Sequence, residues 1–105
     1  QRPTAIFCGN DVIALGAMSA AASLGVKIPE DVTIVGFDNI PMSSWNMFEL
    51  TTAGVALDEM AITAVGLLMQ RMEDSDREVQ RVVMEPQVTL RSTHGRPRDT
   101  ASSNS

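Results

Sequence analysis

Apolar residues in the first third of the chain occur in two short runs, with a stretch of helical spacing between them. The run over residues 4–8 is rich in strand formers and ends in a turn signal, which predicts a buried strand. Between residues 12 and 24 small and apolar residues recur at helical spacing, and Gly25 supplies a left-handed helix end. A second buried strand is predicted over residues 32–35. This order predicts a βαβ unit with parallel strands.

The pattern in the second half of the chain is less regular. Residues 51–55 have the composition of a third strand, and a helix capped by Asp58 carries an apolar stripe as far as Met72. Residues 79–90 are predicted to form a strand pair, or one strand with a break at Pro86. No large apolar residue follows, so residues 93–105 are expected to form a disordered tail.

The predicted fold class is α/β, with a partial doubly wound parallel sheet. Three or four strands and two helices are few for such a sheet, because both of its faces must be covered. The sequence does not begin with Met, and a natural start upstream is expected. Residues 1–92 are therefore expected to be the folded part of a larger unit, whose second helix needs an apolar surface that this sequence does not obviously supply.

Composition and charge exclude several classes of function. The 105 residues include 13 acidic and 8 basic side chains, a formal charge of −5, and the basic residues are scattered. Since nucleic-acid binding draws much of its affinity from phosphate neutralisation, this segment is a poor candidate for touching DNA. No run reaches the roughly 18 apolar residues that span a bilayer, so no membrane segment is expected. A single cysteine cannot form an internal disulfide, which fits a reducing compartment.

Two polar residues follow the first two predicted strands. Asp38 comes just after the strand over residues 32–35 and Gly36, and Asn10 follows the strand over residues 4–8. In open α/β sheets, ligands bind at the carboxyl ends of the strands. An ionised carboxylate offers about four lone-pair positions to donors, and an amide both donates and accepts. The alternatives are structural: Asp38 forms an Asx turn, and Asn10 only caps the helix that follows.

Catalytic and metal-binding residues are not expected. The only histidine, His94, lies in the predicted tail, and Cys8 ends a buried strand, so neither has a base and an orienting group within reach. One His and one Cys do not make a tetrahedral metal site, and the glycines lack the spacing of a phosphate-binding loop. We therefore expect a binding module without catalytic residues, a metal or a cofactor.

Several motifs along the chain resemble those of one protein family. They are Thr4-Ala5-Ile6-Phe7-Cys8-Gly9-Asn10-Asp11, the run Ile28-Pro29-Glu30-Asp31-Val32-Thr33-Ile34-Val35-Gly36-Phe37-Asp38-Asn39-Ile40-Pro41, then Leu50-Thr51-Thr52 and Asp58-Glu59-Met60. Through them, the chain resembles the carboxyl-terminal third of LacI/GalR-family transcriptional regulators from about Pro3 to Ser92. The resemblance implies a fragment of a periplasmic-binding-protein-like type I fold. It also places a helix-turn-helix DNA-binding segment and the other lobe of a two-lobed sensor in a missing amino-terminal part.

The resemblance further implies where a ligand binds. Asp38 corresponds to the ligand-facing acidic residue and Asn10 to a second ligand-proximal position, with Phe37, Val55 and Leu57 as further positions near the ligand. The implied effector is small and polar, either sugar or purine-like, because a carboxylate accepts from two sugar hydroxyls or from a protonated ring nitrogen. The family commonly has a polar residue followed by proline shortly after the paired threonines. The apolar Val55 there favours a less hydroxylated ligand, or no contact.

By the same resemblance, the protein is cytoplasmic, and it is a homodimer with contacts near Leu15, Trp45 and Asn46. Trp45 and Phe48 either stack on a sugar face or, as we favour, pack in the subunit interface, where aromatic residues are enriched. Ligand closure of two lobes would shift the population of DNA-competent dimers. Two alternatives stay open: a periplasmic sugar-binding protein of a transport system, which shares the architecture, and a small α/β enzyme of unassigned chemistry.

Overall fold

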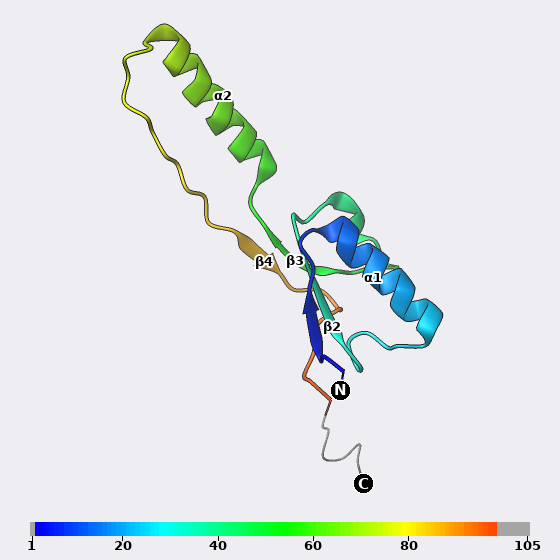
Figure 1. The fold of residues 1–105 in the computed structure, drawn as a ribbon. Coiled ribbons are helices and arrows are strands. Elements are labelled where there is room, and N and C mark those ends of the chain that lie inside the picture. Colours follow the sequence, from blue (N-terminus) through cyan, green and yellow to red (C-terminus); the bar gives the residue numbers. More distant parts are fainter. Residues whose placement is uncertain (1, 99–105) are drawn as a thin grey trace. The chain divides into compact units, whose positions relative to one another are not determined.

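The computed structural model describes residues 2–98, which form a four-stranded sheet and two α-helices (Figure 1). In chain order the elements are β1 (Ala5–Phe7), α1 (Asp11–Leu24), β2 (Thr33–Phe37), the short 3₁₀ helix η1 (Pro41–Ser44), β3 (Thr51–Gly54), α2 (Leu57–Glu73) and β4 (Gln87–Thr89). The strand order is β1-β2-β3-β4, and β2 pairs in parallel with both β1 and β3. The predicted α/β class and the parallel βαβ unit are confirmed.

Contacts divide the chain into two compact units. Within the described part of the chain, the first contains residues 2–54 and 88–98, and the second is Val55–Gln87. The three parallel strands and α1 belong to the first unit, whereas α2 belongs to the second. No helix within residues 2–98 combines the length and the apolar character needed to cross a bilayer.

Helix α1 begins and ends where the sequence predicts. Asn10 is the N-cap, and its side-chain Oδ1 accepts a hydrogen bond from the Ile13 N–H at 2.9 Å. Gly25 ends the helix at φ 71°, a left-handed conformation that a side chain would strain. The helix packs against β2, as expected for the crossover between two parallel strands (Figure 1).

The core of the first unit is small and lies between α1 and the sheet. Its buried apolar members are Cys8, Ala14, Val32, Ile34 and Leu50. Burial raises the pKa of the Cys8 thiol, which keeps this group an inert core residue. All three residues of β1 are exposed, including Phe7 at 72%. The strand over residues 4–8 is thus present, but its predicted burial is wrong within the described residues. Its apolar side chains lack cover there, which agrees with the small number of helices.

Helix α2 forms the predicted apolar stripe, but its start differs from the prediction. Ala56 occupies the N-cap position without a side-chain hydrogen bond, and Asp58 lies in the first turn. Asp58 is therefore not the cap, and its charge acts there through the helix dipole instead. No residue of α2 is buried, and Ile62 and Met72 are 74% and 75% exposed. The expected lack of a covering surface is confirmed for the described residues.

Of the strand pair, or strand with a break at Pro86, that is predicted over residues 79–90, the break at Pro86 is confirmed and the strand before it is wrong. Only β4, which begins directly after Pro86, is a strand, and residues 79–86 have no regular structure. Proline has no N–H to donate to a neighbouring strand, which limits regular pairing to one side of it.

The expected disordered tail is structured at its beginning. Thr93 is 2% exposed: its hydroxyl donates to the Ile34 carbonyl at 2.6 Å and accepts from the Thr51 N–H at 2.9 Å. His94 is half-buried, with Nδ1 2.7 Å from the Thr51 hydroxyl, and so is not a solvated tail residue. We call residues 91–95 the carboxyl-terminal strap; residues 99–105 of the expected tail lie outside the described part.

Two further contacts extend this segment along the sheet. The Thr33 hydroxyl accepts from the Gly95 N–H at 3.0 Å, and Arg98 forms an ion pair with Asp31. The Lys27 N–H donates to the Asp31 carboxylate at 2.9 Å and, with help from Arg98, holds the pKa of Asp31 below its usual value. Polar and charged groups make these contacts, which explains why the hydrophobic pattern did not reveal them.

The buried hydroxyl of Thr93 provides a test of this correction. Thr93→Val keeps the branched shape but leaves the Thr51 N–H and the Ile34 carbonyl without this partner, so we expect a loss of about 1–3 kcal/mol in the free energy of unfolding. Urea unfolding followed by circular dichroism measures it. Thr89→Val is the control, because the Thr89 hydroxyl takes part in none of the hydrogen bonds found within residues 2–98. If the two variants are equally stable, the Thr93 hydroxyl does not contribute to the fold and residue 93 belongs to the tail, as first predicted.

Candidate functional site

Polar groups gather where the parallel strands end. Asn10 and Asp11 follow β1, Asp38 and Asn39 follow β2, and Gly54 is the last residue of β3. Because β1, β2 and β3 run in parallel, their carboxyl ends lie at one edge of the sheet. This edge is the candidate site.

The centre of the edge is the fully buried carboxylate of Asp11. Its Oδ2 accepts from the Ser43 hydroxyl at 2.6 Å and from the Ile40 N–H at 2.9 Å, and its Oδ1 accepts from the Thr52 hydroxyl at 2.6 Å. Asp11 is also in the first turn of α1, where the helix dipole favours a negative charge. Three donors and the helix terminus together compensate the cost of burying it. We call Asp11 and these three donors the Asp11 cluster.

A glycine in the middle of β2 makes room for the Asp11 cluster. A Cβ built on Gly36 would lie 2.3 Å from Asp11 Oδ1 and 3.0 Å from Leu50 Cδ2. The carboxylate and the core leucine are both completely buried. Glycine is thus required at position 36 because the Asp11 carboxylate lies so close to its Cα, and not because the strand bends there.

The turn after β2 holds two consecutive residues at positive φ. Asp38 has φ 125° and Asn39 has φ 57°. The Asp38 N–H donates to the Ala53 carbonyl at 2.7 Å, and the Asn39 N–H donates to the Thr52 hydroxyl at 3.3 Å. A side chain on Gly54 would lie 2.8 Å from the Asp38 carbonyl group. The turn is therefore pressed against the end of β3, and the strain of about 1–3 kcal/mol at Asp38 is imposed by its surroundings.

The side chain of Asp38 is the one carboxylate at this edge that is left for an external partner. It is half-buried and takes part in none of the hydrogen bonds found within residues 2–98. An Asx turn requires the carboxylate to accept from the backbone nearby, and no such bond is present in that range. The geometry leaves Asp38 able to accept hydrogen bonds from a bound molecule.

Asn10 caps α1 with one side-chain atom and keeps its other polar atom available for a further hydrogen bond. Its Oδ1 caps α1 through Ile13, whereas its side-chain NH₂ group takes part in none of the hydrogen bonds within the described residues. Capping and ligand contact are therefore compatible, because they use different atoms of the amide.

The remaining predicted site residues are spread over the chain. Phe37 is half-buried at the end of β2, while Val55 and Leu57 belong to the second unit. Leu15 is half-buried and lines a groove of about 680 Å³ together with Met42, Met47 and Phe48.

The aromatic loop residues lie beside this groove. Trp45 is 51% exposed, and its ring lies 6.4 Å from that of Phe48 in a stacked arrangement. Asn46 is exposed next to it in the chain. An apolar groove with an exposed aromatic residue suits a protein contact better than a polar ligand.

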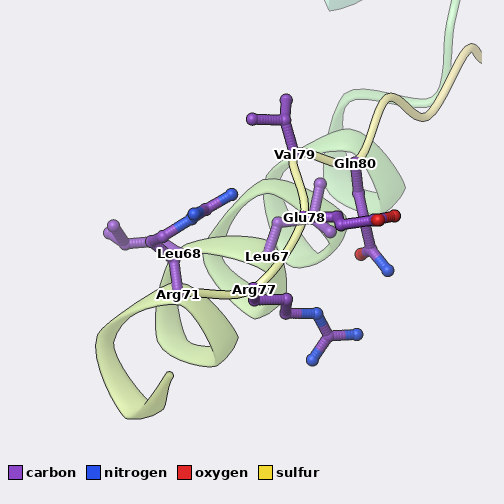
Figure 2. Close-up of a pocket in the computed structure, with 7 residues that line it drawn as sticks. All are labelled: Leu67, Leu68, Arg71, Arg77, Glu78, Val79 and Gln80. Carbon is purple, nitrogen blue, oxygen red and sulfur yellow. The ribbon is translucent and has the colours of Figure 1, made fainter. Parts of the chain in front are cut away.

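The second unit has cavities of its own. A cavity of about 230 Å³ lies between α2 and the segment that follows it (Figure 2), and a smaller one of about 120 Å³ lies near Met60 and Met84. Figure 2 shows Leu67 and Arg71 from the helix on one side and Arg77 and Val79 from the segment on the other. Neither Asp38 nor Asn10 lines these two cavities or the groove at Leu15.

The sequence did not reveal the residues that build the site's framework. Sequence patterns do not identify Asp11, Ser43 or Thr52 as parts of the site. Asp11 meets these partners across 32 and 41 positions of the sequence, so local patterns carry no trace of the contacts. A carboxylate at the first turn of a helix that directly follows a strand was the one available signal.

The close approach at Gly36 predicts a large effect of a single methyl group. Gly36→Ala is expected to destabilise the first unit by about 2 kcal/mol or more, because the added Cβ must displace the Asp11 carboxylate from its donors. Gly66→Ala is the matched control: nothing lies within 4 Å of its Cβ position in α2, and we expect a gain of up to about 1 kcal/mol. Thermal unfolding of both variants checks this, and a Gly36→Ala protein as stable as the parent would refute it.

The strain at Asp38 predicts a gain in stability from removing its side chain. Asp38→Gly relieves the backbone at φ 125° and should raise the free energy of unfolding by about 1 kcal/mol. Asp38→Ala removes the same carboxylate but keeps a Cβ, so it should show no such gain. If the two variants unfold at the same denaturant concentration, the turn is not strained.

Comparison with known proteins agrees with the α/β fold described above. The sequence matches the family described as periplasmic binding protein-like domain over residues 1–94. The HTH-type transcriptional repressor PurR of Aliivibrio fischeri (strain MJ11) is 40% identical over 93 residues, which cover 89% of this chain and 28% of that protein. The chain thus spans just over a quarter of the length of the curated relatives it matches.

Solved structures show the same relationship. A LacI family transcriptional regulator from Enterococcus faecalis V583, with bound ribose, is 31% identical with a TM-score of 0.84, covering 90% of this chain and 35% of that one. A LacI-type transcription regulator from Bifidobacterium animalis subsp. lactis is 35% identical with a TM-score of 0.82, covering 90% and 34%. The sheet and its helices match part of this fold, which is the expected partial periplasmic-binding-protein-like type I architecture. The chain belongs to the periplasmic binding protein-like domain family, in the form found in the effector-binding domain of LacI/GalR-type transcriptional regulators.

Proposed function

We propose that this chain is a ligand-sensing and dimerising segment of a LacI/GalR-type transcriptional regulator. Residues 1–92 would be the carboxyl-terminal portion of its effector-binding domain, and a helix-turn-helix segment elsewhere in the longer protein would bind DNA. The observation that carries the proposal is the Asp38 carboxylate, which is held in a strained turn at the carboxyl end of β2 without a hydrogen bond within residues 2–98. Strain that persists at a strand end is a mark of functional sites.

The effector is a small polar molecule of the sugar or purine-like class. Asp38 accepts from two hydroxyls or from a protonated ring nitrogen, and the free NH₂ group of Asn10 donates to a ligand oxygen. A related regulator of known structure holds ribose, which supports the sugar class. By the family resemblance, Phe37, Val55 and Leu57 would also lie near the ligand. The apolar Val55 favours a less hydroxylated ligand, or no contact.

The remaining parts of the mechanism follow from a two-lobed sensor. Effector bound between two lobes favours the closed state and thereby shifts the population of dimers that bind DNA. Leu15, Trp45 and Asn46 contribute to the dimer contact, in keeping with the groove beside Leu15 and the exposure of Trp45. The protein acts in the cytoplasm and carries out no catalysis. The relatives are named as transcriptional repressors and regulators, which favours this proposal over a periplasmic transport protein.

Calorimetric titration of the full-length protein with D-ribose, other sugars and purine bases tests the site. Asp38→Asn keeps the size of the side chain but removes its charge and replaces one acceptor by a donor, so we expect the affinity to fall about 10- to 100-fold. Glu30→Gln is the matched control, because Glu30 is an exposed carboxylate away from the strand ends. Equal affinity of Asp38→Asn and the parent for a ligand that binds would remove Asp38 from the site.

A further inference from the structure

The turn that carries Asp38 is restrained at four points. Three of the restraints come from the strand ends and the Asp11 cluster: Asp38 N–H to the Ala53 carbonyl, Asn39 N–H to the Thr52 hydroxyl, and Ile40 N–H to Asp11 Oδ2. The fourth comes from the carboxyl-terminal strap. There, Arg91 Nη2 donates to the side-chain Oδ1 of Asn39 at 2.9 Å.

Arg91 connects the turn to the beginning of β3. Its Nη1 donates to the Leu50 carbonyl at 2.9 Å, while its backbone N–H donates to the Thr51 hydroxyl at 2.9 Å. One planar guanidinium thus joins a fixed backbone carbonyl to the Asn39 side chain. A planar group with several donors holds two acceptors in a defined geometry, whereas the donors of an ammonium group on a flexible stem have no such fixed arrangement.

The strap fixes the position of Arg91 itself. The Ser92 N–H donates to the Glu49 carbonyl at 2.9 Å, and the Ile34 N–H donates to the Thr93 carbonyl at 2.9 Å. Together with the buried Thr93 hydroxyl, these bonds anchor the backbone on the carboxyl side of Arg91. The guanidinium therefore reaches the turn from a rigid support.

The hydrogen bond from Arg91 restrains the most exposed residue of the turn, Asn39. Asn39 is exposed, and Arg91 is the one partner of its side chain within residues 2–98. Asn39 and Asp38 both have positive φ, so the backbone has lower-energy conformations available if the restraints loosen. Each such conformation would turn the Asp38 carboxylate in a new direction.

We propose that Arg91 is a positioning residue, which holds the Asp38 carboxylate in its ligand-binding direction through the side chain of Asn39. The proposal rests on the proposed function of Asp38. Arg91 acts here through Asn39 and needs no contact with the effector. The carboxyl-terminal strap is thereby part of the ligand site, although it comes from the end of the sequence farthest from Asn10.

Two measurements on the full-length protein test this role. Arg91→Ala should weaken D-ribose binding about 3- to 10-fold, since it removes a charge-assisted hydrogen bond at an exposed partner. It should also speed amide hydrogen exchange at Asp38, Asn39 and Ile40 about tenfold relative to the amides of α1. Arg81→Ala is the control and should change neither, because Arg81 is exposed and forms no hydrogen bond within the described residues.

Two further variants separate positioning from a general loss of structure. Arg91→Lys keeps the charge but lacks the planar arrangement of donors, so it should fold like the parent and show a smaller change of the same kind. Asn39→Gly keeps a residue that tolerates positive φ but removes the partner of Arg91. Combined with Arg91→Ala, it should cause no further loss of affinity, and losses that multiply would overturn the proposal.

The outcomes distinguish this inference from the proposed function. If Asp38→Asn binds D-ribose as the parent does, the ligand site is wrong, whatever Arg91 does. If Asp38→Asn weakens binding and Arg91→Ala does not, the site stands and the role of Arg91 is wrong. Amide exchange requires no ligand: unchanged exchange at residues 38–40 in Arg91→Ala would refute the positioning role even if D-ribose does not bind.

Discussion

The structure of the first unit depends on one buried carboxylate. Asp11 is completely enclosed, and its two oxygens accept hydrogen bonds from η1, from the backbone before it and from β3. It also begins α1, so a single side chain fixes the start of a helix, the loop after β2 and the third strand relative to one another. Burying an ionised group without donors is prohibitively costly, and each of these elements must therefore be in place before the carboxylate can be enclosed. The same constraint explains why β2 has glycine at position 36.

Sequence patterns predicted those parts of the fold that apolar spacing and local capping determine. The strands near residues 4–8 and 32–35, and helix α1 with Asn10 and Gly25 at its ends, lie where the pattern placed them. Each of these features depends on residues within a few positions of one another. The start of α2 was misplaced, because a cap was assigned from residue type at Asp58 although the helix already begins at Leu57.

The parts that escaped prediction depend on polar contacts between distant residues. Thr93 is buried and donates to the Ile34 carbonyl, and the half-buried Arg91 donates to the Leu50 carbonyl and the Asn39 side chain. Without knowledge of such partners, the polar residues from position 93 onward have the composition of a tail. For the site, position at a strand end and the family resemblance were enough to nominate Asp38 and Asn10. The strained backbone at Asp38 and the contacts that maintain it could not be predicted, because the composition of the chain does not indicate its φ angles.

The contacts of the carboxyl-terminal strap have a consequence for how the protein is made. Thr93 and Ile34 are 59 positions apart, and Thr93 and Thr51 are 42 apart. During synthesis from the amino terminus, β2 and β3 leave the ribosome long before the residues that complete their hydrogen bonding. At ordinary translation rates of about 5–20 residues per second, Thr93 is synthesised several seconds after the strand residues to which it bonds. Over that interval the unpaired backbone groups of the sheet are accessible to chaperones. A chain that ends before residue 93 lacks the groups that complete the hydrogen bonding of β2 and β3.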